Sequence, residues 1–151
     1  PPPEQPSPRK ISKNTLPTVF IIGASCGIGA TYAERFARCG YDLILVARNK
    51  TRMDNLAARL REESHVAVDV LQANLTQPAD LSALETRLRE DARIGILINN
   101  AGIAQSGGFV AQTADDIERL ITLNTTALTR LAAAIAPRFM QSANGAIVNI
   151  G

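Results

Sequence analysis

The 151-residue sequence has no tryptophan, and it contains only two tyrosines, four phenylalanines and one histidine. So few aromatic side chains argue against a surface on which nucleic-acid bases stack. The formal net charge of +2 is also too small for a basic stripe that follows a phosphate backbone. No apolar run approaches the length of a membrane span. We therefore expect neither a nucleic acid nor a membrane as a partner.

Cysteine is scarce as well, because Cys26 and Cys39 are the only two in the sequence. Two cysteines do not make a disulfide framework, and His65 has no further donors at metal-ligand spacing. We expect free thiols, no metal and a cytoplasmic location. The first 17 residues are proline-rich and polar rather than apolar, so we predict a disordered tail without a secretory signal.

From residue 18 onward the sequence alternates between two kinds of segment. Short apolar runs predict strands at 18–22, 42–47, 65–73, 94–99 and 146–150. Segments with helical periodicity lie between them, at 28–39, 51–63, 78–92 and 113–140. This alternation predicts right-handed crossovers and a parallel sheet. The expected fold class is α/β, a doubly wound Rossmann-like sheet of strand order 3-2-1-4-5 in one domain over residues 18–151.

The periodicity also predicts which side of each helix carries an apolar stripe. The stripes are Ile28, Tyr32, Phe36 and Cys39; Met53, Leu56, Ala57 and Leu60; Leu81, Leu84 and Leu88; and Ile117, Leu120, Ile121, Leu128, Leu131 and Ile135. Thr51 and Asp54 are expected to cap the second helix, and Pro137 to bend or end the long fourth one. The last strand, 146–150, reads as covered on both faces.

The segment GASCGIG, residues 23–29, joins the first predicted strand to the first helix. Gly23 would let the chain turn off the strand, Gly27 would leave room for a phosphate, and Gly29 would let the helix approach the sheet. The helix N-terminus would then offer free N–H groups and a positive dipole end to a pyrophosphate. Glycines also serve in plain turns, so this loop alone leaves both interpretations open.

GASCGIG together with NNAG, residues 99–102, resembles the short-chain dehydrogenase/reductase family. The first motif is similar to that family's T-G-x-x-x-G-I-G, with Ile22 where threonine is usual, and the second follows the fourth strand as it does in the family. The resemblance runs from about residue 18 to 151. It implies an NAD(P)-dependent oxidoreductase that interconverts a carbonyl and an alcohol.

The resemblance implies a set of cofactor-binding positions: Gly23, Ser25, Cys26, Gly27, Ile28, Gly29, Arg48, Asn74, Leu75, Asn100, Ala101 and Gly102. Arg48 follows the second strand, where an acidic residue would favour NAD. A guanidinium there suits a 2′-phosphate, so NADP rather than NAD is the expected cofactor. The alternative is a solvated arginine. Cys26 stands where the family often has a second basic residue.

Two asparagines carry further expectations. Asn74 stands where the family usually has an adenine-contacting aspartate, and its amide can still accept that bond; alternatively it only shapes the turn before Thr76. Asn124 interrupts an apolar stripe between Ile121 and Leu128, and a buried amide without partners costs about 1–3 kcal/mol. In the family an asparagine here holds a water of the catalytic proton relay. The alternative is a structural amide bonded to neighbouring backbone.

The family's remaining catalytic groups are a serine shortly after the fifth strand and a tyrosine and lysine in Y-x-x-x-K. This sequence has no Y-x-x-x-K, and no lysine follows Lys50. We therefore interpret residues 1–151 as a fragment, the cofactor-binding portion of a reductase that is truncated after the fifth strand, and expect the 151-residue chain itself to be inactive. The substrate would be a small carbonyl compound or alcohol, and the full-length protein a homo-oligomer.

Two other classes of protein remain open at this point. One is a non-catalytic dinucleotide-binding module or nonfunctional remnant. The other is a different doubly wound enzyme, such as a methyltransferase. The NNAG motif and the spacing of the glycines argue against this second class.

Overall fold

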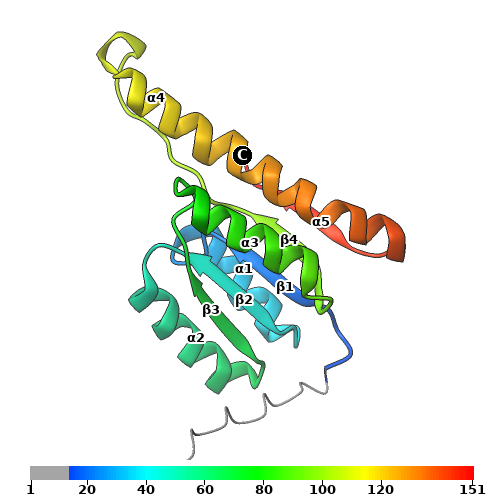
Figure 1. The fold of residues 1–151 in the computed structure, drawn as a ribbon. Coiled ribbons are helices and arrows are strands. Elements are labelled where there is room, and N and C mark those ends of the chain that lie inside the picture. The colour runs from blue at the N-terminus through cyan, green and yellow to red at the C-terminus, as the bar shows by residue number, and fades with distance from the viewer. Residues whose placement is uncertain (1–13) are drawn as a thin grey trace, which may run out of the picture.

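The protein is described by a computed structural model that covers residues 14–151. Most of the predicted tail, residues 1–13, lies outside the described residues. Five strands form one parallel sheet: β1 (Thr18–Ile22), β2 (Leu43–Ala47), β3 (Val68–Gln72), β4 (Ile94–Asn99) and β5 (Ala146–Asn149). Their order is β3-β2-β1-β4-β5 (Figure 1). The predicted fold class and strand order are thus confirmed.

The helices cover both faces of this sheet. They are α1 (Gly27–Arg38), α2 (Lys50–Ser64), α3 (Pro78–Glu90), α4 (Ala114–Ile121) and α5 (Leu128–Ser142), with a 3₁₀ turn η1 (Phe109–Ala111) and a π-helical segment η2 (Thr122–Ala127). Strand side chains alternate between the two faces. Val19 and Ile21 join the cluster under α1 and α2, whereas Phe20 and Ile22 join the cluster under α3 and α5.

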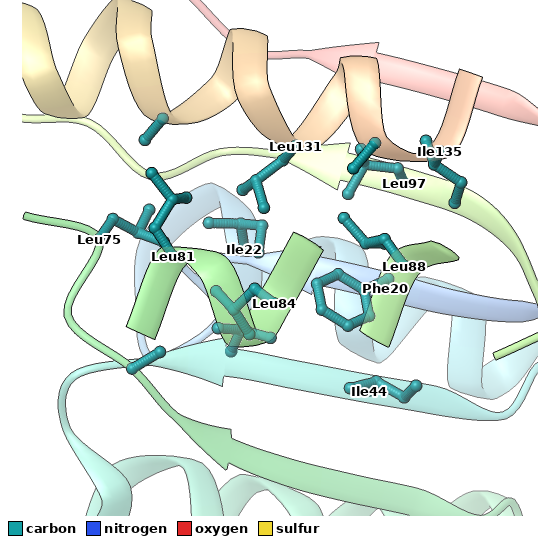
Figure 2. Close-up of a cluster of buried hydrophobic side chains, with 14 of the residues drawn as sticks. Phe20, Ile22, Ile44, Leu75, Leu81, Leu84, Leu88, Leu97, Leu131 and Ile135 are labelled. Carbon is teal, nitrogen blue, oxygen red and sulfur yellow. The ribbon is translucent and has the colours of Figure 1, made fainter. Parts of the chain in front are cut away.

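Figure 2 shows the second of these clusters, in which the leucines of α3 lie near Leu131 and Ile135 of α5. Leu84 and Leu88 lie close to Phe20, and Leu131 and Ile135 approach from α5. The predicted stripe of α3 is confirmed, since Leu81, Leu84 and Leu88 are all buried. The predicted stripe of α2 is confirmed as well, from Met53 to Leu60.

The predicted stripe of α1 is correct only in part: Tyr32 and Phe36 are half-buried and pack against the core, but Ile28 and Cys39 are exposed. The side of α1 that is buried carries the small residues Gly29, Ala33 and Ala37, while the Ile28 side chain is 56% exposed. The helix lies so close to the sheet that only small residues fit between them. The larger aromatics stand at the border instead, where the Tyr32 and Phe36 rings stack with centroids 6.2 Å apart.

The cap predicted for α2 is wrong, because the helix begins earlier than expected. Asn49 is the N-cap residue, and its side-chain oxygen accepts a hydrogen bond of 3.0 Å from the Arg52 N–H. Asp54 instead pairs with Lys50 at 2.6 Å, one turn away. Asparagine caps a helix at least as well as serine or threonine. Asn49 therefore allows α2 to begin at Lys50.

The long fourth helix has about the predicted extent, but Pro137 does not end it and its middle turns are not α-helical. It runs unbroken through α4, η2 and α5 (Figure 1), and Pro137 lies inside α5 without ending it. The wider turns of η2 rotate the buried side, so that Leu123 and Ala127 are buried while Ile121 is 50% exposed. Of the predicted stripe, Leu131 and Ile135 are buried, Ile121 is exposed, and the others are half-buried, namely Ile117, Leu120 and Leu128.

The last strand is less covered than predicted. Within the described residues β5 pairs only with β4, so it forms an edge of the sheet, as the predicted strand order implies. Ile147 and Val148 are half-buried rather than buried.

Candidate functional site

A cleft of about 860 Å³ opens at the carboxyl ends of β1, β2, β3 and β4. This is the edge at which open α/β sheets bind their ligands. Eight of the twelve predicted cofactor-binding residues line it: Gly23, Ser25, Cys26, Arg48, Leu75, Asn100, Ala101 and Gly102. Gly27, Ile28, Gly29, Asn74 and the relay candidate Asn124 are not among the lining residues.

The glycine loop forms one wall of the cleft by a very close approach of backbone segments. Gly23 has a φ of +74°, and a Cβ atom on it would lie 2.9 Å from the Ala101 nitrogen. A Cβ atom on Gly29 would lie only 2.2 Å from the Gly23 oxygen. Asn100 joins the two segments, because its amide donates a 3.2 Å hydrogen bond to that same oxygen. The first and third glycines therefore do the steric work predicted for them.

The start of α1 faces this loop without a side-chain cap. Cys26 is the N-cap residue, it is exposed, and it makes no side-chain capping bond. Gly27 has a φ of +57°, and a Cβ atom there would have no neighbour within 4 Å. The first N–H groups of a helix carry a partial positive charge when nothing caps them. This corner of the cleft is thus suited to an anionic group.

Arg48 comes directly after β2, the strand next to β1, and lines a second wall of the cleft. Its side chain is exposed and belongs to none of the ion pairs found among residues 14–151. Four more polar residues, which the sequence analysis did not assign to the site, line the cleft beside it, namely Asn49, Lys50, Thr51 and Arg52. The signal for them was present in the run RNKTR, which concentrates basic residues immediately after a strand.

The charge of this wall is not balanced by acids. The residues that line the cleft include Arg48, Lys50 and Arg52 but no aspartate or glutamate. The first turn of α2 also lacks an acid, although acidic residues are favoured there by the helix dipole. Of these three cations, Lys50 alone has an acidic partner among residues 14–151, namely Asp54. The cleft therefore presents a cationic wall to any ligand that enters it.

The acids with lowered pKa values lie away from the cleft. A hydrogen bond from the Arg93 side chain lowers the pKa of Asp91 to about 2, and Arg130 lowers the pKa of Glu85 in the same way. None of these four residues lines the cleft. The Glu85–Arg130 pair joins α3 to α5, whereas Asp91 and Arg93 pair within the connection from α3 to β4.

The two asparagines make the contacts of their structural alternatives. The Asn74 oxygen accepts bonds of 3.1 and 2.7 Å from the Thr76 N–H and hydroxyl, as expected of a turn. The Asn124 oxygen accepts a 2.8 Å bond from the Ile103 N–H, and its NH₂ donates a 2.7 Å bond to the Ile103 oxygen. Adenine contact by Asn74 and a relay role for Asn124 stay predictions. What Asn124 visibly does is hold the segment after β4.

A sequence profile described as "short chain dehydrogenase" matches residues 17–151. The chain belongs to the short-chain dehydrogenase family. The very-long-chain 3-oxoacyl-CoA reductase-A of Danio rerio is 31% identical over 134 residues, which cover 86% of this chain and 42% of that protein.

Solved structures of this short-chain dehydrogenase family match the fold closely. A short-chain dehydrogenase from Sphingobium yanoikuyae in complex with NADPH is 80% identical with a TM-score of 0.89, covering 90% of this chain and 53% of that one. A bulky-bulky ketone specific alcohol dehydrogenase from Comamonas testosteroni is 67% identical with a TM-score of 0.90, covering 91% and 55%. The chain thus spans about half the length of these proteins.

Two further observations concern only the part of this family member that the structure describes. Among residues 14–151 no helix combines the length and apolar character of a membrane span. Those residues also hold no group of three or more His, Cys, Asp or Glu side chains suited to a metal ion.

Proposed function

We propose that this chain is the cofactor-binding portion of an NADP-dependent oxidoreductase that interconverts a carbonyl and an alcohol. The cationic wall of the cleft carries the cofactor assignment, because Arg48 and Arg52 line it without an acidic partner among residues 14–151. The 80% identical protein from Sphingobium yanoikuyae, whose structure is in complex with NADPH, supports the same assignment. The bound cofactor would supply or accept the hydride.

Residues on two sides of the cleft would bind different parts of the cofactor. The uncapped start of α1, with Ser25, Cys26 and Gly27, would receive the pyrophosphate through backbone N–H groups. Arg48 would bind the 2′-phosphate of the adenosine ribose by charge-assisted hydrogen bonds. Ala101 and Gly102, which lack long side chains, would let the ribose lie against the backbone. Asn74, whose oxygen already accepts two bonds from Thr76, would contact the adenine through its amide.

Two broader features belong to the same proposal. The whole protein would work in the cytoplasm, which is supported by the free, exposed thiols of Cys26 and Cys39. It would form a homo-oligomer, which is supported by exposed apolar side chains on the long helix, Ile121 at 50% and Met140 at 81%. Asn124 would hold a water of the proton relay, in addition to its bonds with Ile103.

We predict that Arg48→Ala selectively weakens ligands that carry a 2′-phosphate. A hydrogen bond to a charged group contributes roughly 1.5–3 kcal/mol, so the dissociation constant of 2′-phospho-AMP should rise about 10- to 100-fold. AMP lacks the phosphate, and its affinity should stay nearly unchanged. Calorimetry with both ligands measures the difference. The matched control is Arg38→Ala, an exposed arginine in the last turn of α1 that does not line the cleft. Equal losses for both ligands would contradict this role of Arg48.

We predict that a polypeptide of residues 1–151 binds NADPH without oxidising it. General acid–base catalysis typically contributes about 10²–10⁴-fold, and these residues include no Y-x-x-x-K to supply it. The measurement is NADPH absorbance with a panel of ketones and aldehydes, beside the same assay on the full-length protein. Turnover by the 151-residue polypeptide that disappears in Asn124→Ala would show that the catalytic groups are misplaced here. No turnover by the full-length protein would count against a reductase.

A further inference from the structure

Gln72 is a residue of the cleft to which the proposed function assigns no role. It is the last residue of β3, the strand at the other edge of the sheet, and it lines the cleft beside Arg48. Its side-chain NH₂ donates a 2.9 Å hydrogen bond to the backbone oxygen of Arg48. The bond therefore connects the proposed 2′-phosphate residue to a neighbouring strand.

The position of this bond gives it a specific effect on Arg48. Ala47 and Gln72 are the last paired residues of β2 and β3, and one further ladder bond joins the Ala73 N–H to the Ala47 oxygen at 3.0 Å. Arg48 is the first residue beyond that ladder. On its other side, α2 is fixed from Asn49 onward by the cap on the Arg52 N–H. The Gln72 side chain spans the single residue between these two fixed elements.

We infer that Gln72 is a positioning residue for cofactor selectivity, which acts by holding the backbone of Arg48 so that its guanidinium meets a 2′-phosphate. The inference rests on the proposed NADP site. Binding through Arg48 requires both its side chain and its backbone to be ordered, and a backbone that is already fixed removes the second part of that cost. Without the bond, Arg48 keeps its charge but loses its placement, and small displacements of binding groups weaken affinity strongly.

The test compares Gln72→Met with the original chain. Methionine has the same length and no N–H donor, so the bond to the Arg48 oxygen is lost while the bulk remains. The control is Gln141→Met, the same change at an exposed position of α5 outside the cleft. A neutral hydrogen bond has a net effect equivalent to roughly two- to tenfold in affinity. By calorimetry, the dissociation constant of 2′-phospho-AMP should rise by that factor, and that of AMP should stay unchanged.

A double-mutant cycle separates positioning from direct contact. In an Arg48→Ala background, Gln72→Met should change 2′-phospho-AMP binding no further, because the residue through which Gln72 acts is gone. A persisting loss in that background would show that Gln72 touches the ligand, and it would overturn the inference. Equal losses for AMP and 2′-phospho-AMP, or no loss for either, would overturn it too.

Two other outcomes of the experiment can be told apart from a failure of the inference about Gln72 alone. If Gln72→Met lowers the unfolding temperature too far for binding to be measured, Gln72→Asn takes its place, since its amide is one methylene too short for a 2.9 Å bond and should give the same selective loss. If the original chain binds neither ligand, the proposed function itself fails, and the inference fails with it. If the original chain binds 2′-phospho-AMP but Gln72→Met weakens both ligands equally, the inference about Gln72 fails while the proposed function stands.

Discussion

Replacing Gly29 by alanine is expected to destabilise the chain by about 3 kcal/mol, the upper end of typical overpacking costs, and to abolish binding of NADPH. The added methyl carbon would lie 2.2 Å from the Gly23 oxygen, 2.9 Å from the Gly23 carbonyl carbon and 2.7 Å from the Asn100 amide nitrogen. Two of these three atoms are backbone, so they cannot rotate away. The N-terminal turn of α1 must instead move off the end of β1.

Helix propensity alone predicts the opposite sign for this substitution. Alanine is favoured over glycine in a helix by about 1 kcal/mol. Unfolding in urea, followed by circular dichroism, therefore distinguishes the two effects by their sign. Calorimetry with NADPH then tests whether the displaced turn still binds, which we expect it not to do, because the start of α1 forms the proposed pyrophosphate site.

Gly108→Ala is the matched control. Gly108 has an ordinary φ of −72°, and a Cβ atom there would meet nothing within 4 Å. Alanine at such a position typically stabilises by about 0.4–1 kcal/mol through the unfolded chain. If Gly29→Ala behaved like Gly108→Ala, the close approach of α1 to Gly23 would not exist in solution.

The sequence was sufficient to predict the layout of the sheet, because that layout depends on patterns that repeat along the chain. Buried parallel strands are continuous apolar runs, and their alternation with helices leaves few possible topologies. The stripes of α2 and α3 were predictable for the same reason, since each is an ordinary helix with leucines at regular spacing. The glycine loop was predictable because a tight turn and a close backbone approach both require glycine.

The errors lie where the structure departs from regular geometry. A helical wheel assumes 3.6 residues in every turn, and the wider turns of η2 cannot be anticipated from that assumption. In α1 the apolar stripe misled because distance to the sheet, rather than hydrophobicity, selected Gly29, Ala33 and Ala37 for the buried side. A contact between residues far apart in sequence is equally hard to predict. The 3.0 Å bond from the Asn99 amide to the Asn149 oxygen is an example.

The candidate site was predicted in outline but not in its supporting contacts. The motif residues that line the cleft follow from the family resemblance, which concerns the groups that touch the cofactor. Gln72 and Asn49 touch the backbone of the chain instead, and no spacing in the sequence indicates which carbonyl or N–H a side chain will reach. Those contacts depend on where β3 and α2 end, and element boundaries are the least regular part of a fold.

Replacing Asn124 by alanine is the second change for which we expect a large effect. Both polar groups of the Asn124 amide bond the backbone of Ile103, at 2.8 and 2.7 Å. Ile103 is half-buried and lines the cleft. Alanine would leave the N–H and the carbonyl of Ile103 without these partners, and each such group costs about 1–3 kcal/mol when water cannot replace the bond. We expect a loss of about 2–4 kcal/mol in the free energy of unfolding.

The same substitution should weaken cofactor binding. The amide holds the segment that carries Ala101 and Gly102, and a Cβ atom on Gly102 would lie 3.1 Å from the Asn124 oxygen. Thr125→Ala is the control, because Thr125 is exposed in the same π-helical segment. Calorimetry with NADPH should show a loss for Asn124→Ala and none for Thr125→Ala. Equal effects of the two substitutions would mean that they act through the π-helical segment rather than through Ile103.

Asn124→Asp allows the two bonds to be separated by pH. An ionised aspartate can still accept from the Ile103 N–H, but it cannot donate, and it faces the Ile103 oxygen at short range. The protonated carboxyl can do both, so folding should raise its pKa above the ordinary value of about 3.9. Stability linked to the proton is then fully present below that ordinary value and is lost as pH rises through the raised pKa of the folded state.

Measured against the original chain at each pH, the deficit of Asn124→Asp in the free energy of unfolding should therefore be small near pH 3.5 and larger at pH 7. Comparison at the same pH cancels the acid sensitivity of other groups, such as Asp91. Its pKa is lowered from 3.8 to about 2, so the stability that it contributes is lost progressively as pH falls below 3.8. A deficit that did not depend on pH would show that the donated bond to the Ile103 oxygen contributes nothing. The hold of Asn124 on the segment after β4 would then rest on the accepted bond alone.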